Sequence, residues 1–194
     1  MTDFAAVADV LAQPDPPVWL VTAQAGGRRG GLVATFASSA SIVTDRPRVL
    51  VGLAKQHHTW ELVDASRAFV LHLLAADQLD LVWRFGLQSG RDVDKLAGLA
   101  VEQTGGGPRV CDAPAWLDCR VEASLDTGDR TVHVAAVRAG RRERAAELLT
   151  LRRVVQAAPP ERLRALKDAL ARDAAVDAGL IDAWRARGGA ALSP

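Results

Sequence analysis

Residues 18–36, VWLVTAQAGGRRGGLVATF, decide the fold class of this 194-residue chain. The apolar and β-branched runs at 18–23 and 32–36 both predict strands. Between them, residues 25–31 contain four glycines, which tolerate the positive φ angles that a tight turn needs. The stretch therefore predicts an antiparallel hairpin at the start of a β domain.

Outward from this hairpin, apolar strands alternate with short connections. Further strands are predicted at 48–54, 68–74, 117–125 and 131–139. Short helices are predicted at 3–13, at 58–65 and from an N-cap at Asp77 to about Phe85. The run Gly105–Pro108 is predicted to be a loop.

The composition changes at Glu143, after which Ala, Leu, Arg and Glu dominate and glycine is rare. This predicts helices at 143–157 and 160–187, separated by Pro159 and Pro160. Strands with short hairpins, followed by a helical tail, favour a mainly β, antiparallel barrel over a doubly wound sheet.

Composition and charge exclude several classes of function. The 24 basic and 23 acidic side chains give a net charge of +1, which argues against nucleic-acid binding. Two cysteines and four histidines show neither a disulfide framework nor metal-ligand spacing. No apolar run reaches the ~20 residues of a membrane helix, and no basic-then-apolar leader is seen, so a cytoplasmic protein is expected.

The stretch 34–41 is unusual because most of its side chains are small or carry hydroxyls. Small side chains let a ligand approach the backbone, and hydroxyls donate and accept without charge, which suits a planar polar ring. The alternative is a strand end at a close sheet contact. The candidate residues are Ala34, Thr35, Phe36, Ser38, Ser39, Ala40 and Ser41.

A second candidate segment begins where the strand at 48–54 ends and a helix starts. Free N–H groups at a helix N-terminus favour a phosphate, and a lysine, histidines and a threonine are close by. The alternative is ordinary capping with surface histidines. The candidate residues are Ala54, Lys55, His57, His58 and Thr59. We expect both segments to converge on one mononucleotide.

Several motifs together resemble the flavin reductase-like, FMN-binding split-barrel family. Residues 31–41, GLVATFASSAS, are similar to its pattern G-M-T-A-S-x-x-[ST]-S-V-S. Residues 69–74, FVLHLL, are similar to F-V-V-N-V-L, and residues 94–98, DKLAG, to D-K-F-A-G. Asp45-Arg46-Pro47 stands for D-P-P, and Gly128-Asp129-Arg130-Thr131 for G-D-H-T. The resemblance covers residues 18–139.

The resemblance implies an antiparallel, Greek-key-like split β-barrel over 1–142, with short peripheral helices and a helical extension over 143–194 packed on the barrel or on a dimer. It implies a homodimer that binds FMN, with FAD as the other flavin, in a groove near the subunit interface. Residues 34–41 would hold the ring and the ribityl side, and Ala54, Lys55, His57 and Thr59 the phosphate. The residues that would close over the site are Phe85, Gly90, Arg91 and Lys95.

The activity that the resemblance implies is hydride transfer from NAD(P)H to flavin, with an unknown acceptor or partner oxidoreductase. Three positions depart from the family: Val33 replaces a threonine, Arg130 a histidine and Ala136 an acidic residue. The second function considered is therefore an FMN-binding electron carrier without NAD(P)H activity of its own. Arg130 itself is expected to be an exposed hairpin arginine; the alternative is that it favours an anionic reduced flavin or a phosphate-bearing substrate.

Overall fold

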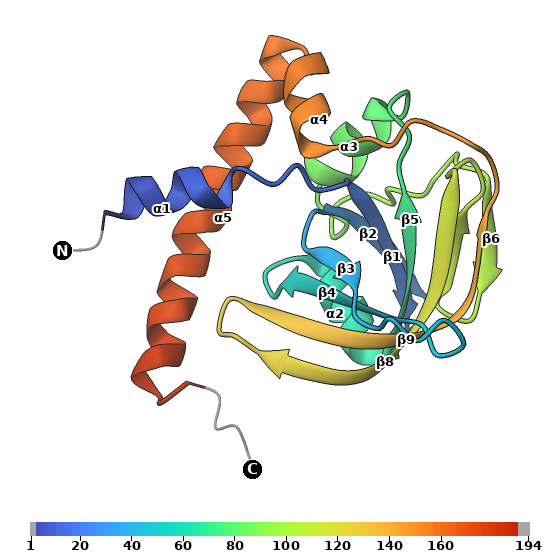
Figure 1. Cartoon of the computed structure of the whole chain (residues 1–194), viewed down its shortest axis with the longest axis horizontal. Helices are drawn as coiled ribbons and strands as arrows, with labels where there is room; N and C mark the ends of the chain where they lie inside the picture. Colours follow the sequence, from blue (N-terminus) through green and yellow to red (C-terminus); the bar gives the residue numbers. More distant parts are fainter. Residues whose placement is uncertain (1–2, 190–194) are drawn as a thin grey trace.

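A seven-stranded antiparallel sheet forms the body of the protein in the computed structural model, which describes residues 3–189 (Figure 1). The strand order is β2-β1-β5-β8-β9-β4-β3. The strands are β1 (Trp19–Ala25), β2 (Arg28–Ala34), β3 (Ala37–Ser39), β4 (Arg48–Ala54), β5 (Ala68–Leu73), β8 (Ala115–Asp126) and β9 (Arg130–Arg142). The two edge strands, β2 and β3, are joined only by Thr35 and Phe36, so the curled sheet closes there into a split barrel. The predicted fold class is confirmed.

The predicted hairpin at 18–36 is present, with a shorter turn. Gly26 and Gly27 adopt φ angles of +55° and +76°, the left-handed conformations of a two-residue hairpin turn. Ala25 pairs with Arg28, so residues 28–31 belong to β2 and not to the turn. A second hairpin joins the two longest strands, β8 and β9, through residues 127–129.

Two apolar clusters hold the barrel. The first fills its interior and includes Val21, Val51, Phe69 and, from α2 (His58–Ser66), Leu62, all of which are fully buried. The second lies outside the barrel beneath α3 (Leu79–Gly86) and α4 (Leu151–Ala157). Because α2 contributes to the interior cluster, its N-terminus is fixed against the end of β4.

One local prediction was incomplete and two were wrong. Residues 101–110 form a hairpin, β6 (Val101–Thr104) and β7 (Gly107–Val110), around the glycines predicted as a loop. Gln78, not Asp77, is the N-cap of α3. Residues 143–150 are not helical because the backbone of Leu149 bonds to Val18 and Leu74, each at 2.8 Å, which holds this segment extended.

Two helices extend from the barrel on one side (Figure 1). They are α1 (Phe4–Leu11) and the 27-residue α5 (Pro160–Ala186), and neither contains a buried residue. Among residues 3–189, no helix has both the length and the apolar character needed to cross a membrane. The division of the chain at 142/143 stays a prediction.

Candidate functional site

A groove of about 320 Å³ lies beside the N-terminus of α2. One wall is β2, the second is the segment after α3, and the third is α5, whose residues Leu166, Leu170 and Asp173 face the groove. It includes five of the residues predicted from the sequence: His57, His58, Thr59, Phe85 and Arg91.

The N-terminus of α2 carries no side-chain cap. Its first-turn N–H groups and the positive end of the helix dipole therefore favour an anion at this point. A side chain at Gly30 would come within 3.3 Å of Leu62 and 3.4 Å of His58, so glycine allows β2 to approach the helix. This close approach brings the groove-lining Leu32 and Val33 next to the helix entry.

Cationic side chains surround the groove, and each has a partner. Arg91 donates to the carbonyl of Gln56 at 3.0 Å and to Glu61 at 2.5 Å. The buried Lys95 ammonium donates to the carbonyls of Phe85 and Gln88 at 3.0 and 3.1 Å, and burial lowers its pKa to about 8.

His57 is less tightly held. Its Nε2 lies 3.5 Å from Asp173 of α5. Burial lowers the pKa of His57, against the opposing pull of the Asp173 carboxylate. The groove thus combines an uncapped helix start with imidazole, guanidinium and ammonium groups, a donor set that suits a phosphate.

Two predicted phosphate residues lie outside the groove lining. Lys55 points to the tip of the β8–β9 hairpin, where its ammonium lies 2.6 Å from Asp126. Ala54 is buried at the end of β4. Their assignment to a phosphate stays a prediction.

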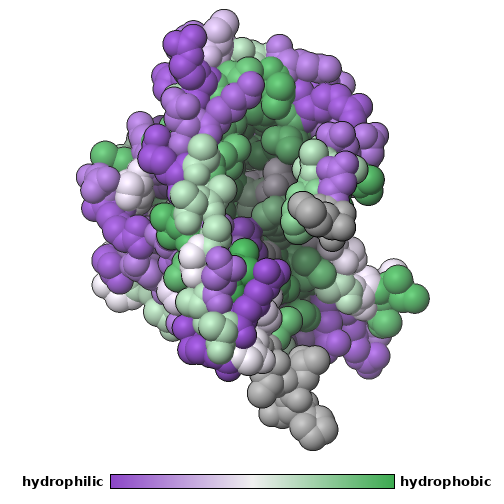
Figure 2. Space-filling model, turned by 90° about the vertical axis from the view of Figure 1, so that its left-hand side faces the viewer, coloured by the Kyte–Doolittle hydropathy of each residue, from purple (hydrophilic) through white to green (hydrophobic). Residues whose placement is uncertain are grey.

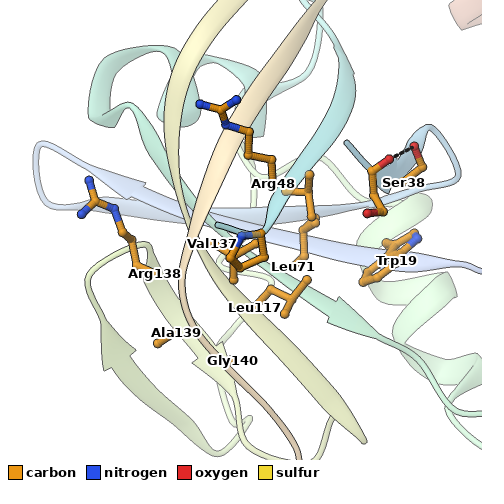
Figure 3. A pocket seen from close by; sticks show the side chains of 12 residues that line it. Trp19, Ser38, Arg48, Leu71, Leu117, Val137, Arg138, Ala139 and Gly140 are labelled. Atoms are coloured by element: carbon orange, nitrogen blue, oxygen red, sulfur yellow. Dashed lines mark hydrogen bonds between the residues drawn. The ribbon is translucent and has the colours of Figure 1, made fainter. Parts of the chain in front are cut away.

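The hydroxyl-rich segment lines a different cavity, of about 540 Å³, whose other lining residues come mainly from β1, β4, β5, β8 and β9 (Figure 3). Ser38 and Ser39 face it together with Trp19, Leu71 and Leu117. The Ser38 hydroxyl donates to the carbonyl of Ser39 at 3.3 Å, the dashed line in Figure 3. Beyond them, Ala40 and Ser41 continue the segment, and Ser41 Oγ accepts from the Val43 N–H at 3.0 Å.

Within one chain, the two segments do not share a cavity, and strand geometry explains this. Ser38 and Ser39 pair with Leu50 and Val49 at the start of β4, whereas residues 55–59 follow its end. Seven residues of strand span roughly 20 Å. Only Ala34, Thr35 and Phe36, at the beginning of the segment, lie toward the far end of β4, where the Gly52 N–H donates to the Phe36 carbonyl at 2.8 Å.

Arg130 connects the two regions, and the expectation that it is simply exposed was wrong. Its guanidinium lies 4.9 Å from the centre of the Phe36 ring. It also bonds to Asp129 at 2.5 Å and to Asp177 of α5 at 3.0 Å. Only 25% of the side chain is exposed, because α5 covers it.

Sequence reasoning missed Gln56, Asp173 and Asp177. Gln56 donates to Asp177 Oδ1 at 2.9 Å, so the middle of α5 is bonded to the predicted phosphate segment. The sequence places both aspartates on the same stripe of α5 as Leu166, but it does not show which surface that stripe covers. Among residues 3–189, no cluster of three His, Cys, Asp or Glu side chains is arranged to hold a metal ion.

A family model, the flavin reductase like domain, matches residues 15–159. The chain belongs to this family. The resemblance inferred from the motifs is thereby confirmed, and the split barrel is the fold of a flavin reductase-like domain.

Curated relatives of this flavin reductase-like chain include a monooxygenase reductase component and a rubredoxin, both of which it matches over only part of their length. It is 34% identical to the reductase component of 4-nitrophenol 4-monooxygenase/4-nitrocatechol 2-monooxygenase from Rhodococcus opacus, over 62% of each chain. It is 32% identical to the high molecular weight rubredoxin of Moorella thermoacetica, over 62% of this chain and 53% of the relative. The chain thus spans less than two thirds of these relatives.

A solved structure also resembles the flavin reductase-like chain. It is that of the nitrilotriacetate monooxygenase component B homolog from Mycobacterium thermoresistibile, with 26% identity and a TM-score of 0.65. The match covers 77% of this chain and 87% of that one.

Proposed function

We propose that this protein is an FMN-binding flavin reductase that transfers hydride from NADH or NADPH to flavin. Membership of the flavin reductase like domain family carries the proposal. The reductase component among the relatives supports a further step, in which reduced flavin passes to a separate monooxygenase component. Because NADH and NADPH are cytoplasmic reductants, the proposal places the protein in the cytoplasm.

The groove beside α2 fits the phosphate end of the flavin. His57, Thr59 and Arg91 line it at an uncapped helix start. Gly90 allows the segment after α3 to lie close to His58, because a β-carbon at this position would come within 3.1 Å of the His58 ring. Of the predicted ring side, residues 34–41, Ala34, Thr35 and Phe36 lie toward the end of β4 that leads to this groove, so within one chain these three are the proposed ring contacts. The bound flavin would supply the redox chemistry, while these residues bind and orient it.

Replacing Arg91 with glutamine is expected to weaken FMN binding about tenfold, because a charge-assisted hydrogen bond to the phosphate is lost. Riboflavin, which lacks the phosphate, should bind nearly as before. The measurement is flavin fluorescence quenching, followed by NADH and NADPH oxidation with added FMN. Arg164→Gln, at an exposed arginine of α5, is the matched control. No FMN binding by the unaltered protein at micromolar concentrations would refute the proposal.

The second candidate function is an FMN-binding electron carrier without NAD(P)H activity. Arg130, which stands where the family has histidine, favours it, as does the rubredoxin among the relatives. Stopped-flow mixing of the FMN-loaded protein with NADH and with NADPH separates the two candidates. Rapid bleaching of the flavin spectrum supports the reductase, and its absence supports the carrier.

A homodimer is the second part of the proposal, and the exposed apolar face of α1 supports it. Phe4, Val10 and Leu11 are 78%, 69% and 76% exposed. Figure 2 shows apolar atoms gathered around a hollow on the side that carries α1 and α5. Sedimentation should give twice the chain mass, and Phe4→Ser with Leu11→Ser should shift the protein toward monomer. A wild-type monomer at micromolar concentrations would contradict this.

A further inference from the structure

The barrel-facing stripe of α5 contains two aspartates. Seven residues of the helix are shielded among exposed neighbours, at spacings of three or four, so they form one face. Five of them are apolar, and the two near the middle are carboxylates. The seven are Leu163, Leu166, Ala169, Asp173, Asp177, Ile181 and Trp184.

Both carboxylates contact the segment at the start of α2 that is proposed to bind the flavin phosphate, and Asp177 also bonds to Arg130 of β9. Asp177 accepts from Gln56 at 2.9 Å and from Arg130 at 3.0 Å. Asp173 lies 3.5 Å from the ring of His57. The apolar ends of the stripe hold the helix on either side: Leu166 packs against the second apolar cluster, and Trp184 lies against Gly128.

The two aspartates contribute little as structural anchors. The half-exposed contact between His57 and Asp173 contributes about 0–1 kcal/mol. In the largely shielded pair of Arg130 and Asp177, the cost of removing both charges from water offsets much of their attraction. Asp177 is only 14% exposed, and burial raises its pKa against the opposing pull of Arg130, with Asp129 and Asp173 adding like charge. Two carboxylates are therefore held, at an electrostatic cost, against three groups that could donate to an anion, His57, Gln56 and Arg130.

We infer that Asp173 and Asp177 are internal anions that compete with the flavin phosphate for His57, Gln56 and Arg130. They lower the affinity for phosphorylated flavins and leave the affinity for the flavin ring unchanged. This inference rests on the proposed function. It makes α5 a determinant of flavin specificity: a phosphate must take the place of the carboxylates, whereas riboflavin need not.

The test is the double substitution Asp173→Asn with Asp177→Asn. Asparagine at 177 keeps one acceptor oxygen for Gln56, while Arg130 loses its bond to α5 and keeps Asp129. Both charges are removed, and the apolar ends of the stripe still hold the helix. We expect the dissociation constant for FMN to fall about tenfold and that for riboflavin to change less than twofold. Asp168→Asn with Asp182→Asn, at exposed positions on the same helix, is the matched control and should change neither.

Thermal unfolding of each variant confirms that it is folded, and the two single substitutions replace the pair if it is not. Unchanged FMN affinity in variants of a protein that binds FMN overturns the inference and leaves the proposed function standing. Equal tightening of FMN and riboflavin also overturns it, because α5 would then act only as a steric cover. If no variant and no wild-type protein binds either flavin, the proposed function itself fails.

Discussion

Replacing Gly106 with alanine is expected to destabilise the protein by about 3 kcal/mol or more. A β-carbon at this position would stand against the carbonyl oxygen of Phe69 and 2.8 Å from its carbonyl carbon. Both atoms belong to the backbone of β5, an interior strand between β1 and β8, which cannot move without disturbing these neighbours. The Gly106 N–H also donates to the buried carboxylate of Asp118 at 3.0 Å, so a shift of the loop would unpair that group.

Urea unfolding followed by tryptophan fluorescence measures the effect. Gly105→Ala is the matched control, because a β-carbon there meets only the Asp118 carboxylate, at 3.5 Å, in ordinary contact. The control should lie within about 0.5 kcal/mol of the unaltered protein. Equal stability of the two variants would show that β5 and the β6–β7 turn do not touch as closely as the structure has them.

Gly106 also shows what the sequence could and could not predict. The glycine run indicated a chain reversal, because glycine tolerates turn conformations, and a reversal is present between β6 and β7. The run did not indicate the contact with Phe69, because that contact joins residues 37 positions apart. The strand at 48–54 was predicted to the residue, since its apolar run is bounded by a proline and a lysine.

The same distinction applies to the candidate site. Local pattern placed His57, His58 and Thr59 at the entry of a helix, and the structure has them in one groove with Phe85 and Arg91. The local sequence pattern could not predict where α5 packs, because the apolar stripe of a helix does not indicate which surface of the protein the helix covers. The carboxylates that α5 brings to Gln56 and Arg130 are therefore known only from the tertiary structure.

Acidification between pH 7 and pH 5 is expected to reduce the free energy of unfolding by about 3–4 kcal/mol, because two histidines are buried in their neutral form. The first is His72, which is fully buried. Its Nδ1 lies 3.1 Å from the carbonyl of Leu20, and its Nε2 accepts from the Val110 N–H at 3.0 Å. This bonding requires the proton on Nδ1 and a lone pair on Nε2. Burial lowers the pKa of His72 to about 4.

The second is His133 on β9. Its Nδ1 lies 2.9 Å from the Ser124 hydroxyl, and its Nε2 is buried without a partner among the described residues. Burial lowers the pKa of His133 to about 4, and the nearby Arg67 lowers it further, against the pull of Asp64. A second proton on this ring would therefore be a buried charge with no acceptor.

The sign of the effect follows from proton uptake. In the unfolded chain, His72 and His133 have ordinary pKa values of about 6.5. Stability is therefore fully retained above pH 6.5, falls as the pH drops and stops falling from this cause below about pH 4, where both states are protonated. Each histidine contributes up to about 1.4 kcal/mol per pH unit within that window. The carboxyl of Glu143, with a pKa of about 2, adds its own loss only at lower pH.

Urea unfolding at half-unit steps from pH 7.5 to 5 gives the slope, which should approach two protons taken up on unfolding near pH 5. His133→Phe removes one of them and leaves no polar nitrogen unpaired, so the slope should fall by about one proton. His57→Gln, at a histidine that is 42% exposed, should alter the slope much less. A wild-type slope below half a proton across this range would mean that both rings titrate alike in the folded and unfolded chains, and that neither is buried as the structure has it.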